Sequence, residues 1–230
     1  MRKVVVGAFV SLDGVMQAPG GPEEDPTGGF EFGGWTPPFW DETLNAAMGE
    51  NFSEPFDLLL GRRTYDIFAA HWPFVEMDPA ASSFNELNMQ IARQFNGITK
   101  YVATHHPDTL TWQNSQALGP DVAQAVRDLK KGDGPILLTQ GSTELLQLLF
   151  EHDLVDELRL VVMPVVLGKG KRLFGTSSMP AAFKLAKSAT SPSGAIVATY
   201  ERAGPVQTGS FAMDEPTEAE LERRRKLKSS

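Results

Sequence analysis

Two adjacent arginines follow a short apolar run in the first third of the chain. The run 58–60 predicts a buried strand, Gly61 permits a turn, and Arg62, Arg63 and Thr64 open a short helical pattern. Arginines in the first turn of a helix lie at the positive end of its dipole, where each is unfavourable by roughly 0.3–1 kcal/mol. A bound phosphate would offset that cost, so the pair indicates an anion site. The alternative is that both side chains turn back to carboxylates on the surface.

Two other predicted strand ends carry polar residues. Thr104 and His105 follow one strand, and the segment Gln140-Gly141-Ser142-Thr143-Glu144 follows another and opens a leucine-rich helix. The carboxyl ends of parallel strands share one edge of a sheet, where ligands bind. Backbone N–H groups at such a helix start could hold a phosphate, although the same residues also form an ordinary cap. Together the three junctions fit a dinucleotide that carries a further phosphate at its 2′ position.

A carboxylate, Asp13, follows the first predicted strand in the turn Ser11-Leu12-Asp13-Gly14. It could relay a proton or anchor a substrate, and the alternative is that it only favours the turn. The segment 168–171 resembles a phosphate loop but lacks the third glycine and the following helix, so we expect a turn. The four histidines do not have metal-ligand spacing, and we expect no metal site.

The elements that would position these residues alternate between strand and helix over the first two thirds of the chain. We expect strands at 4–10, 58–60, 101–104 and 135–140, a brief one at 110–112, and helices at 41–52, 85–96 and 120–131. A strand over 157–167 contains Pro164, which favours an edge position or a bulge, and 183–190 with 195–202 predicts a hairpin. This order predicts an α/β three-layer sandwich with a mixed central β-sheet flanked by helices.

Two segments lie outside this alternation. Residues 17–38 are rich in Gly, Pro and acidic residues but contain Phe30, Phe32 and Trp35, which is typical of a loop that covers a site. The alternative is a surface excursion pinned by its aromatic side chains. Residues 203–230 predict a charged, partly helical tail, whose basic cluster 223–226 is either a solvated helix face or a partner-binding arm.

Composition limits the partners and the location of the protein. The 230 residues fit one domain, 1–202, with the tail appended. A net charge of −8 argues against nucleic-acid and anionic-membrane partners, and the absence of cysteine excludes disulfides. No apolar run approaches the ~20 residues of a membrane span, and the first apolar run is too short for a signal peptide. We therefore expect a cytoplasmic protein with a small-molecule partner.

These motifs together resemble the dihydrofolate-reductase-like superfamily. The branch with the strongest resemblance is similar to the C-terminal reductase domain of riboflavin-biosynthesis deaminase-reductases. The resemblance covers residues 3–202 and is carried by the order of four segments: 11–14, 60–65, 140–142 and 155–174. It implies NADPH as the hydride donor and a homodimer. The deaminase half and its zinc signature are missing, which excludes deamination.

The resemblance also implies roles for particular residues. Gly61, Arg62, Arg63 and Thr64 match the segment that grips the cofactor phosphates, and Thr104 and His105 match the one beside the adenosine and its 2′-phosphate. The turn under the pyrophosphate corresponds to Gly141, Ser142, Thr143 and Glu144, with Gln140 directly before it.

The substrate side is implied by fewer residues. Asp13 and the loop after it match the region that closes over nicotinamide and substrate. Trp40 and Asp41 lie near the place where folate reductases keep an acid for the pterin ring, so Trp40 is a candidate substrate contact. Asp13 and Asp41 are the candidates for assisting protonation.

Three functions remain open from the sequence. The first is an NADPH-dependent reductase of a small heteroaromatic substrate that is pterin-like, pyrimidine-like or flavin-like. The second is a non-catalytic NADP(H)-binding or regulatory protein on the same fold. The third is an interaction module that uses the charged tail as its arm and binds no nucleotide.

Overall fold

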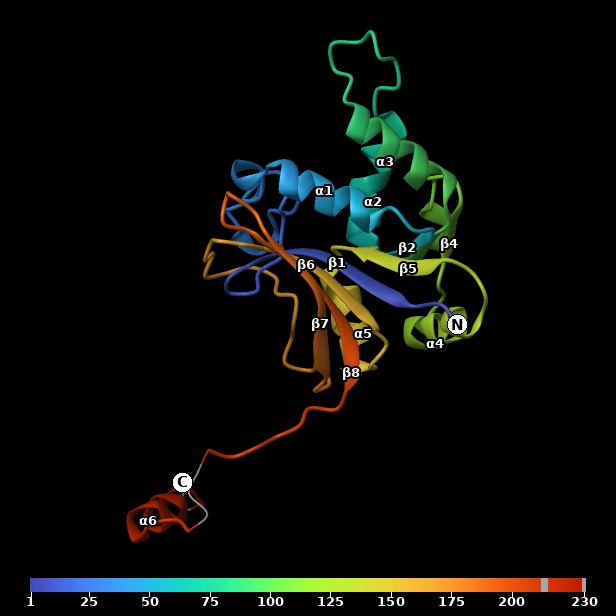
Figure 1. Cartoon of the computed structure of the whole chain (residues 1–230). Helices are drawn as coiled ribbons and strands as arrows, with labels where there is room; N and C mark the ends of the chain where they lie inside the picture. Colours follow the sequence, from blue (N-terminus) through green and yellow to red (C-terminus); the bar gives the residue numbers. More distant parts are fainter. Residues whose placement is uncertain (212–214, 229–230) are drawn as a thin grey trace.

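A single mixed β-sheet runs through the middle of the protein (Figure 1). A computed structural model describes residues 1–211 and 215–228. The strand order is β4-β3-β2-β5-β1-β6-β8-β7. The strands are β1 Val4–Ser11, β2 Phe56–Gly61, β3 Lys100–Ala103, β4 Ser115–Ala117, β5 Ile136–Gln140, β6 Glu157–Met163, β7 Ala182–Thr190 and β8 Ile196–Gly204.

The parallel part of the sheet is centred on β1, a strand with a nearly continuous apolar sequence. Val4, Val5 and Val6 of β1 are fully buried, and β1 pairs in parallel with both β5 and β6. Strands that are covered on both faces need such apolar runs. The hairpin of β7 and β8 adds two antiparallel strands at one edge. The predicted fold class, with parallel strands in the middle and a C-terminal hairpin, is confirmed.

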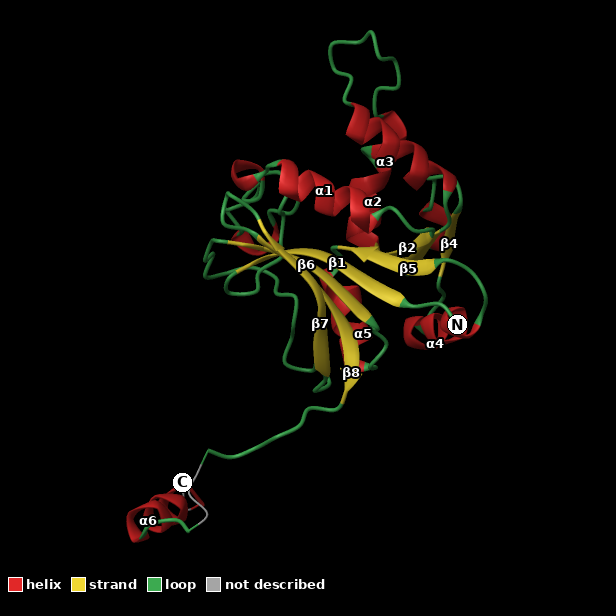
Figure 2. Ribbon diagram, in the orientation of Figure 1, coloured by secondary structure: helices red, strands yellow, loops and turns green. Residues whose placement is uncertain are grey.

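Helices cover both faces of the sheet (Figure 2). They are α1 Glu42–Asn51, α2 Arg62–Ala69, α3 Glu86–Gly97, α4 Val122–Lys131 and α5 Thr143–Glu151. Helix α6 Glu218–Lys228 follows the last strand and does not cover the sheet. The 3₁₀ turns are η1 Thr27–Gly29, η2 Pro37–Phe39, η3 Trp72–Phe74 and η4 Pro107–Thr109. Tyr65 of α2 and Phe95 of α3 are buried on one face, and Val126 of α4 and Leu146 of α5 are buried on the other.

Two predicted strands are wrong in detail. Residues 110–112 form no strand, because the Trp112 backbone N–H donates to the Tyr65 hydroxyl at 2.8 Å instead of joining a ladder. The strand in this region is β4, three residues later. Pro164 lies outside β6, which ends at Met163 because proline has no N–H to continue the pairing. The predicted edge position is also wrong, since β6 lies between β1 and β8.

The C-terminal segment is helical where the sequence predicts a partly helical tail. Strand β8 continues to Gly204, two residues past the predicted boundary. Helix α6 contains no buried residue. The predicted tail also includes residues 212–214 and 229–230, which lie outside the described residues. Among the described helices, none combines the length and the apolar character that crossing a membrane requires.

Candidate active site

A cavity of about 970 Å³ opens at the carboxyl ends of four parallel strands. Its lining includes Ala8 from β1, Gly61 after β2, Thr104 after β3 and Gln140 from β5. This is the edge of a parallel sheet at which ligands bind. Its volume lies at the upper end of the usual range for ligand pockets.

The structure brings the predicted cofactor residues together at this cavity. All of them contribute to its lining: Gly61, Arg62, Arg63, Thr64, Thr104, His105, Gln140, Gly141, Ser142, Thr143 and Glu144. They come from three segments that are separated by about 40 residues each in the sequence, and the parallel sheet places them side by side. Trp40, the candidate substrate contact, also lines the cavity, packs on Phe9 and is 38% exposed.

The helices that begin at the cavity differ from the other helices of the sheet layers. Asp41, Asn85 and Asp121 cap α1, α3 and α4 with their side chains. Neither α2 nor α5 has such a cap in the described structure. The hydroxyl of Ser142, which precedes α5, instead accepts the Gly61 N–H at 2.9 Å and joins the two turns. The first N–H groups of both helices are therefore left to an acceptor other than a capping side chain.

The two arginines line the cavity and also contact carboxylates: Arg62 turns to the exposed Asp66, as the surface-carboxylate alternative from the sequence has it, whereas Arg63 binds the buried Asp25. Arg62 binds Asp66 through Nε at 2.9 Å, and this hydrogen bond raises the pKa of Arg62. Its Nη1 lies 3.4 Å from the Thr104 hydroxyl and contacts the Thr109 hydroxyl. Arg62 therefore bridges the start of α2 and the end of β3.

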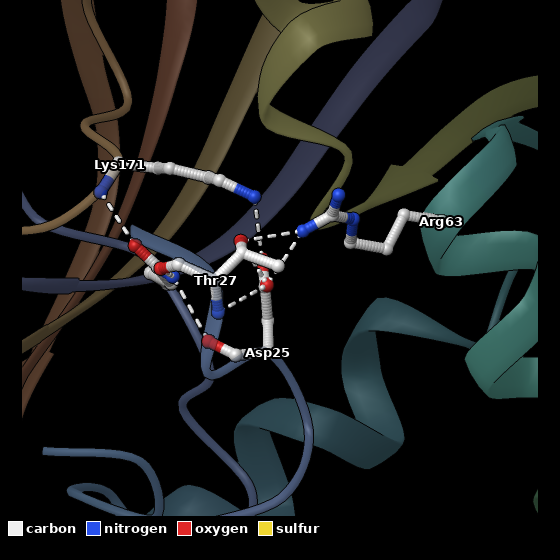
Figure 3. Close-up of polar contacts among 5 residues, drawn as sticks. Asp25, Thr27, Arg63 and Lys171 are labelled. Carbon is white, nitrogen blue, oxygen red and sulfur yellow. Dashed lines mark hydrogen bonds and ion pairs between the residues drawn. The ribbon is translucent and has the colours of Figure 1, made fainter. Parts of the chain in front are cut away.

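Arg63 belongs to a cluster of polar side chains from α2, the loop 17–38 and the segment after β6 (Figure 3). Its Nη1 lies 2.6 Å from both the Asp25 carboxylate and the Thr27 hydroxyl, and Lys171 contacts the other Asp25 oxygen at 2.6 Å. Burial raises the pKa of Asp25, but hydrogen bonds from Lys171, Thr27 and Arg63 outweigh it and lower that pKa to about 2. We call Asp25, Arg63 and Lys171 the latch.

The latch fastens residues 17–38, which we call the strap. The buried rings of Phe30 and Trp35 anchor the strap, and Trp35 Nε1 donates to the Gln17 carbonyl at 2.8 Å. The strap also contributes Gln17, Pro19 and Glu24 among other residues to the cavity lining. Both interpretations from the sequence therefore apply: aromatic side chains pin the loop, and the loop borders the site.

The turn at residues 168–171, after β6, packs against the strap and binds it by a hydrogen bond. The Lys171 N–H donates to Gln17 Oε1 at 3.0 Å. Gly170 has φ +127°, and a Cβ there would approach a Val15 carbon to 2.6 Å and a Phe30 carbon to 2.9 Å. The close approach explains why glycine occupies this position of the predicted turn.

The two candidate proton donors lie elsewhere. Asp13 accepts hydrogen bonds from the Ser11 hydroxyl and from the backbone of Leu167 and Gly168, which lower its pKa to about 2. Asp41 caps α1 and accepts the Ser191 hydroxyl, an interaction that lowers its pKa. Neither residue is part of the cavity lining. Both carboxylates hold loops together in this structure.

Another carboxylate that the sequence analysis did not single out does line the cavity. Glu24 of the strap is partly buried, and burial raises its pKa against the opposing hydrogen bonds from the Gly20 and Gly21 N–H groups. A carboxylic acid with a raised pKa can carry a proton at neutral pH more readily than Asp13 or Asp41. The acidic run 23–25 inside an aromatic-anchored loop was the available sequence signal.

Apolar side chains form the side of the cavity that α1, α2 and α3 cover. We call this group the wall: Met48, Phe52, Ile67, Phe68, Trp72, Leu87, Ile91 and Phe95. Sequence reasoning missed most of the wall, because apolar residues at helical spacing are indistinguishable from ordinary core residues.

A buried donor without a partner marks the floor of the cavity. Gln140 Nε2 is shielded from solvent and has no hydrogen-bond partner in the described structure, and it packs against Gly7, where a Cβ would approach it to 2.6 Å. Buried polar atoms of this kind call for an explanation, and the described residues supply no acceptor for this one. Within the described residues no group of His, Asp or Glu could hold a metal ion.

Comparisons with known proteins relate the whole body of the chain to one family. A family model described as the RibD C-terminal domain matches residues 2–197. The protein YyaP of Bacillus subtilis (strain 168), itself described as uncharacterised, is 25% identical over 206 residues that cover 86% of this chain and 94% of that protein.

Solved structures of reductases share the fold. Dihydrofolate reductase from Enterococcus faecalis, complexed with NADP(H), is 14% identical with a TM-score of 0.51, over 87% of this chain and 96% of that one. The diaminohydroxyphosphoribosylaminopyrimidine deaminase/5-amino-6-(5-phosphoribosylamino)uracil reductase of Thermotoga maritima is also 14% identical, with a TM-score of 0.52, over 88% of this chain and 57% of that one. At this level of identity the likeness shows the fold alone.

Proposed function

The chain belongs to the RibD C-terminal domain family, and from this premise we propose that it is an NADPH-dependent reductase of a small heteroaromatic substrate. The substrate would be pterin-like, pyrimidine-like or flavin-like. The observation that carries the proposal is the pair of uncapped helix N-termini, α2 and α5, beside Arg62 at one cavity. The NADP(H) held by the dihydrofolate reductase of Enterococcus faecalis supports the choice of cofactor.

Different residues of the site would bind different parts of the cofactor. The starts of α2 and α5 would hold the diphosphate through backbone N–H groups, with Gly141 allowing the close approach. Arg62 and Thr104, which lie 3.4 Å apart between α2 and β3, would hold the 2′-phosphate. When bound, the nicotinamide supplies the hydride.

The remaining parts of the site orient the acceptor and limit its contact with water. The wall would position the acceptor ring, and the latched strap would shield it from solvent. Glu24 would hold the proton that the reduced acceptor takes up. The chain would therefore accelerate hydride transfer largely by positioning the acceptor against the cofactor.

A non-catalytic NADP(H)-binding protein is the second candidate. It is favoured by one observation, which is that neither predicted proton donor lines the cavity. It would bind NADPH as the reductase does but would not oxidise it with any acceptor. Assays with dihydrofolate and aminopyrimidine ribosides as acceptors would separate these two candidates by the loss of NADPH absorbance.

Replacement of Arg62 tests the cofactor assignment. Trp72 lines the cavity, so its fluorescence can report nucleotide binding. In Arg62→Ala we expect NADPH to bind about tenfold more weakly or worse, because one charge-assisted hydrogen bond is lost, while NADH is little affected. Arg93→Ala is the control, since Arg93 is exposed on α3 and does not line the cavity. Equal affinity of the wild type for NADPH and NADH would contradict the assignment.

A further inference from the structure

Helix α2 gives the cavity two chemically different ends. Arg63 and Thr64 lie in its first turn, and Ile67 and Phe68 follow them four residues later, all in the cavity lining. Residues four apart share one face of a helix and are displaced by about one 5.4 Å turn along its axis. The cavity therefore passes along α2 from the phosphate-binding end to the wall.

The wall contains a cluster of packed aromatic rings. The ring centroids of Phe52, Phe68 and Trp72 lie 5.3, 5.7 and 5.0 Å from that of Phe95, and the ring of Phe68 is stacked on it at 20°. Asn88, at the exposed start of α3, is the polar residue that this part of α3 adds to the lining. Aromatic surfaces of this kind bind flat rings through stacking and edge-to-face contacts.

The Arg and Lys side chains that line the cavity are each paired with a carboxylate. Three Arg or Lys side chains are part of the lining, and Arg62 is bound by Asp66, Thr104 and Thr109 at the end of β3. Arg63 and Lys171 both bind Asp25 on the strap. An anionic group buried against the wall would therefore compete with Asp66 or Asp25 for a cation, and the cost of burying an unpaired charge is several kcal/mol.

We infer that the acceptor is a flat ring system that carries no phosphate or other anionic group. This inference rests on the proposed function and narrows the substrate class of the same site. The Thermotoga maritima reductase is named for a phosphoribosylated uracil, and the wall of the present chain has no cation for that group.

Riboflavin and FMN are the probes that test this inference, because they share a three-ring system and differ by one phosphate. Binding is measured by quenching of flavin fluorescence with saturating NADP⁺, so that the FMN phosphate cannot use the nucleotide site. We expect riboflavin to bind at least about tenfold more tightly than FMN. Equal or tighter binding of FMN would overturn the inference, and so would the absence of binding by both riboflavin and the neutral quinone menadione, whose binding is measured by Trp72 fluorescence.

A gain-of-function variant provides the second arm. Asn88→Arg places a cation at the exposed rim of the wall, and we expect FMN to bind about tenfold more tightly while riboflavin changes little. Gln90→Arg is the matched control, because Gln90 is exposed on the same helix and does not line the cavity. An Asn88→Arg variant that favours FMN no more than Gln90→Arg does would also overturn the inference. Failure of the proposed function is read separately, as the absence of NADPH binding in the fluorescence titration.

Discussion

At the residue scale, two successive residues with positive φ shape the turn between β5 and α5. Gly141 has φ +67° and Ser142 has φ +68°. Glycine adopts this conformation freely, whereas for serine it costs of the order of 1 kcal/mol or more. The strained turn places the Ser142 hydroxyl against the Gly61 N–H and leaves the start of α5 without a side-chain cap. An observed outlier of this kind at a cavity favours a role in ligand binding.

Replacing this glycine should affect both folding and binding. In Gly141→Ala the added Cβ is strained at φ +67°, so we expect the free energy of unfolding to fall by about 1–2 kcal/mol. The disturbed turn should also weaken NADPH binding. Urea denaturation and the fluorescence titration measure the two effects.

The matched control is Gly49→Ala. Gly49 lies within α1, and nothing lies within 4 Å of the Cβ it would gain. Alanine there should stabilise the protein by roughly 0.5–1 kcal/mol and leave NADPH binding unchanged. Wild-type stability and affinity in Gly141→Ala would contradict the role assigned to the turn.

The same scale shows which site residues can be predicted from sequence. The grouping of Arg62, Thr104 and Gly141 was predictable, because each follows a strand and parallel strands end at the same edge of the sheet. The positions of Asp13 and Asp41 relative to the cavity were not. A sequence shows a carboxylate, but it does not show whether backbone N–H groups will bind it, as they do in both cases.

At the element scale, the latch connects three segments that are distant in sequence. Asp25 of the strap binds Arg63 of α2 and Lys171 of the turn after β6. The Asp25 side chain is 10% exposed, so its charge is stabilised by these partners more than by water. Opening the strap requires separation of at least one of these pairs. The latch should therefore influence the rates at which ligands bind and leave.

Asp25→Asn tests that coupling. The substitution removes the carboxylate that holds both cations, so we expect roughly 1–3 kcal/mol less stability. We also expect NADPH to dissociate several-fold faster, measured by stopped-flow displacement with excess unlabelled nucleotide. Glu23→Gln is the control, because Glu23 is an exposed acid of the same loop. A dissociation rate equal to that of the wild type would show that the latch does not govern access.

The latch also predicts a pH dependence. The pKa of Asp25 is about 2 in the folded protein and about 3.9 in an unfolded chain. Because the folded pKa is the lower one, the stabilisation is complete above about pH 4 and is lost as the pH falls towards 2. Between these values the melting temperature of the wild type should fall more steeply than that of Asp25→Asn.

At the element scale, the features of single segments could be predicted from the sequence. Contacts between segments that are distant in the sequence could not. Pro164 was predicted to lie inside a strand, at an edge position or a bulge, whereas it follows the end of the central strand β6. The strap was predictable from its aromatic anchors. Its fastening was not, because Lys171 lies 146 residues from Asp25 and in isolation is one of several lysines near a glycine turn.

At the scale of the whole molecule, the residues that stabilise the fold and the residues that line the cavity occupy different parts of the sheet. The apolar strands and the layers on both faces form the core, and the carboxyl edge collects the polar turns. Alternating strand and helix patterns are sufficient to predict that division. They are not sufficient to predict the wall, because the same helices α1, α2 and α3 carry both core and cavity residues.

The tail permits a test of where the folded unit ends. Strand β8 ends at Gly204 and α6 contains no buried residue, so a chain that ends at residue 208 loses no buried part of α6 and keeps the sheet. We expect its melting temperature to stay within about 2 °C of the wild type and its NADPH affinity to be unchanged.

A chain that ends at residue 195 instead loses β8, which pairs with both β6 and β7, and should not fold. The five acids and five bases of residues 203–230 cancel, so the shorter chain keeps the net charge of −8 and its solubility is a fair comparison. A fall of more than about 4 °C after removal of the tail alone would mean that the tail stabilises the folded domain, and unchanged stability would leave the tail free to act as a partner-binding arm.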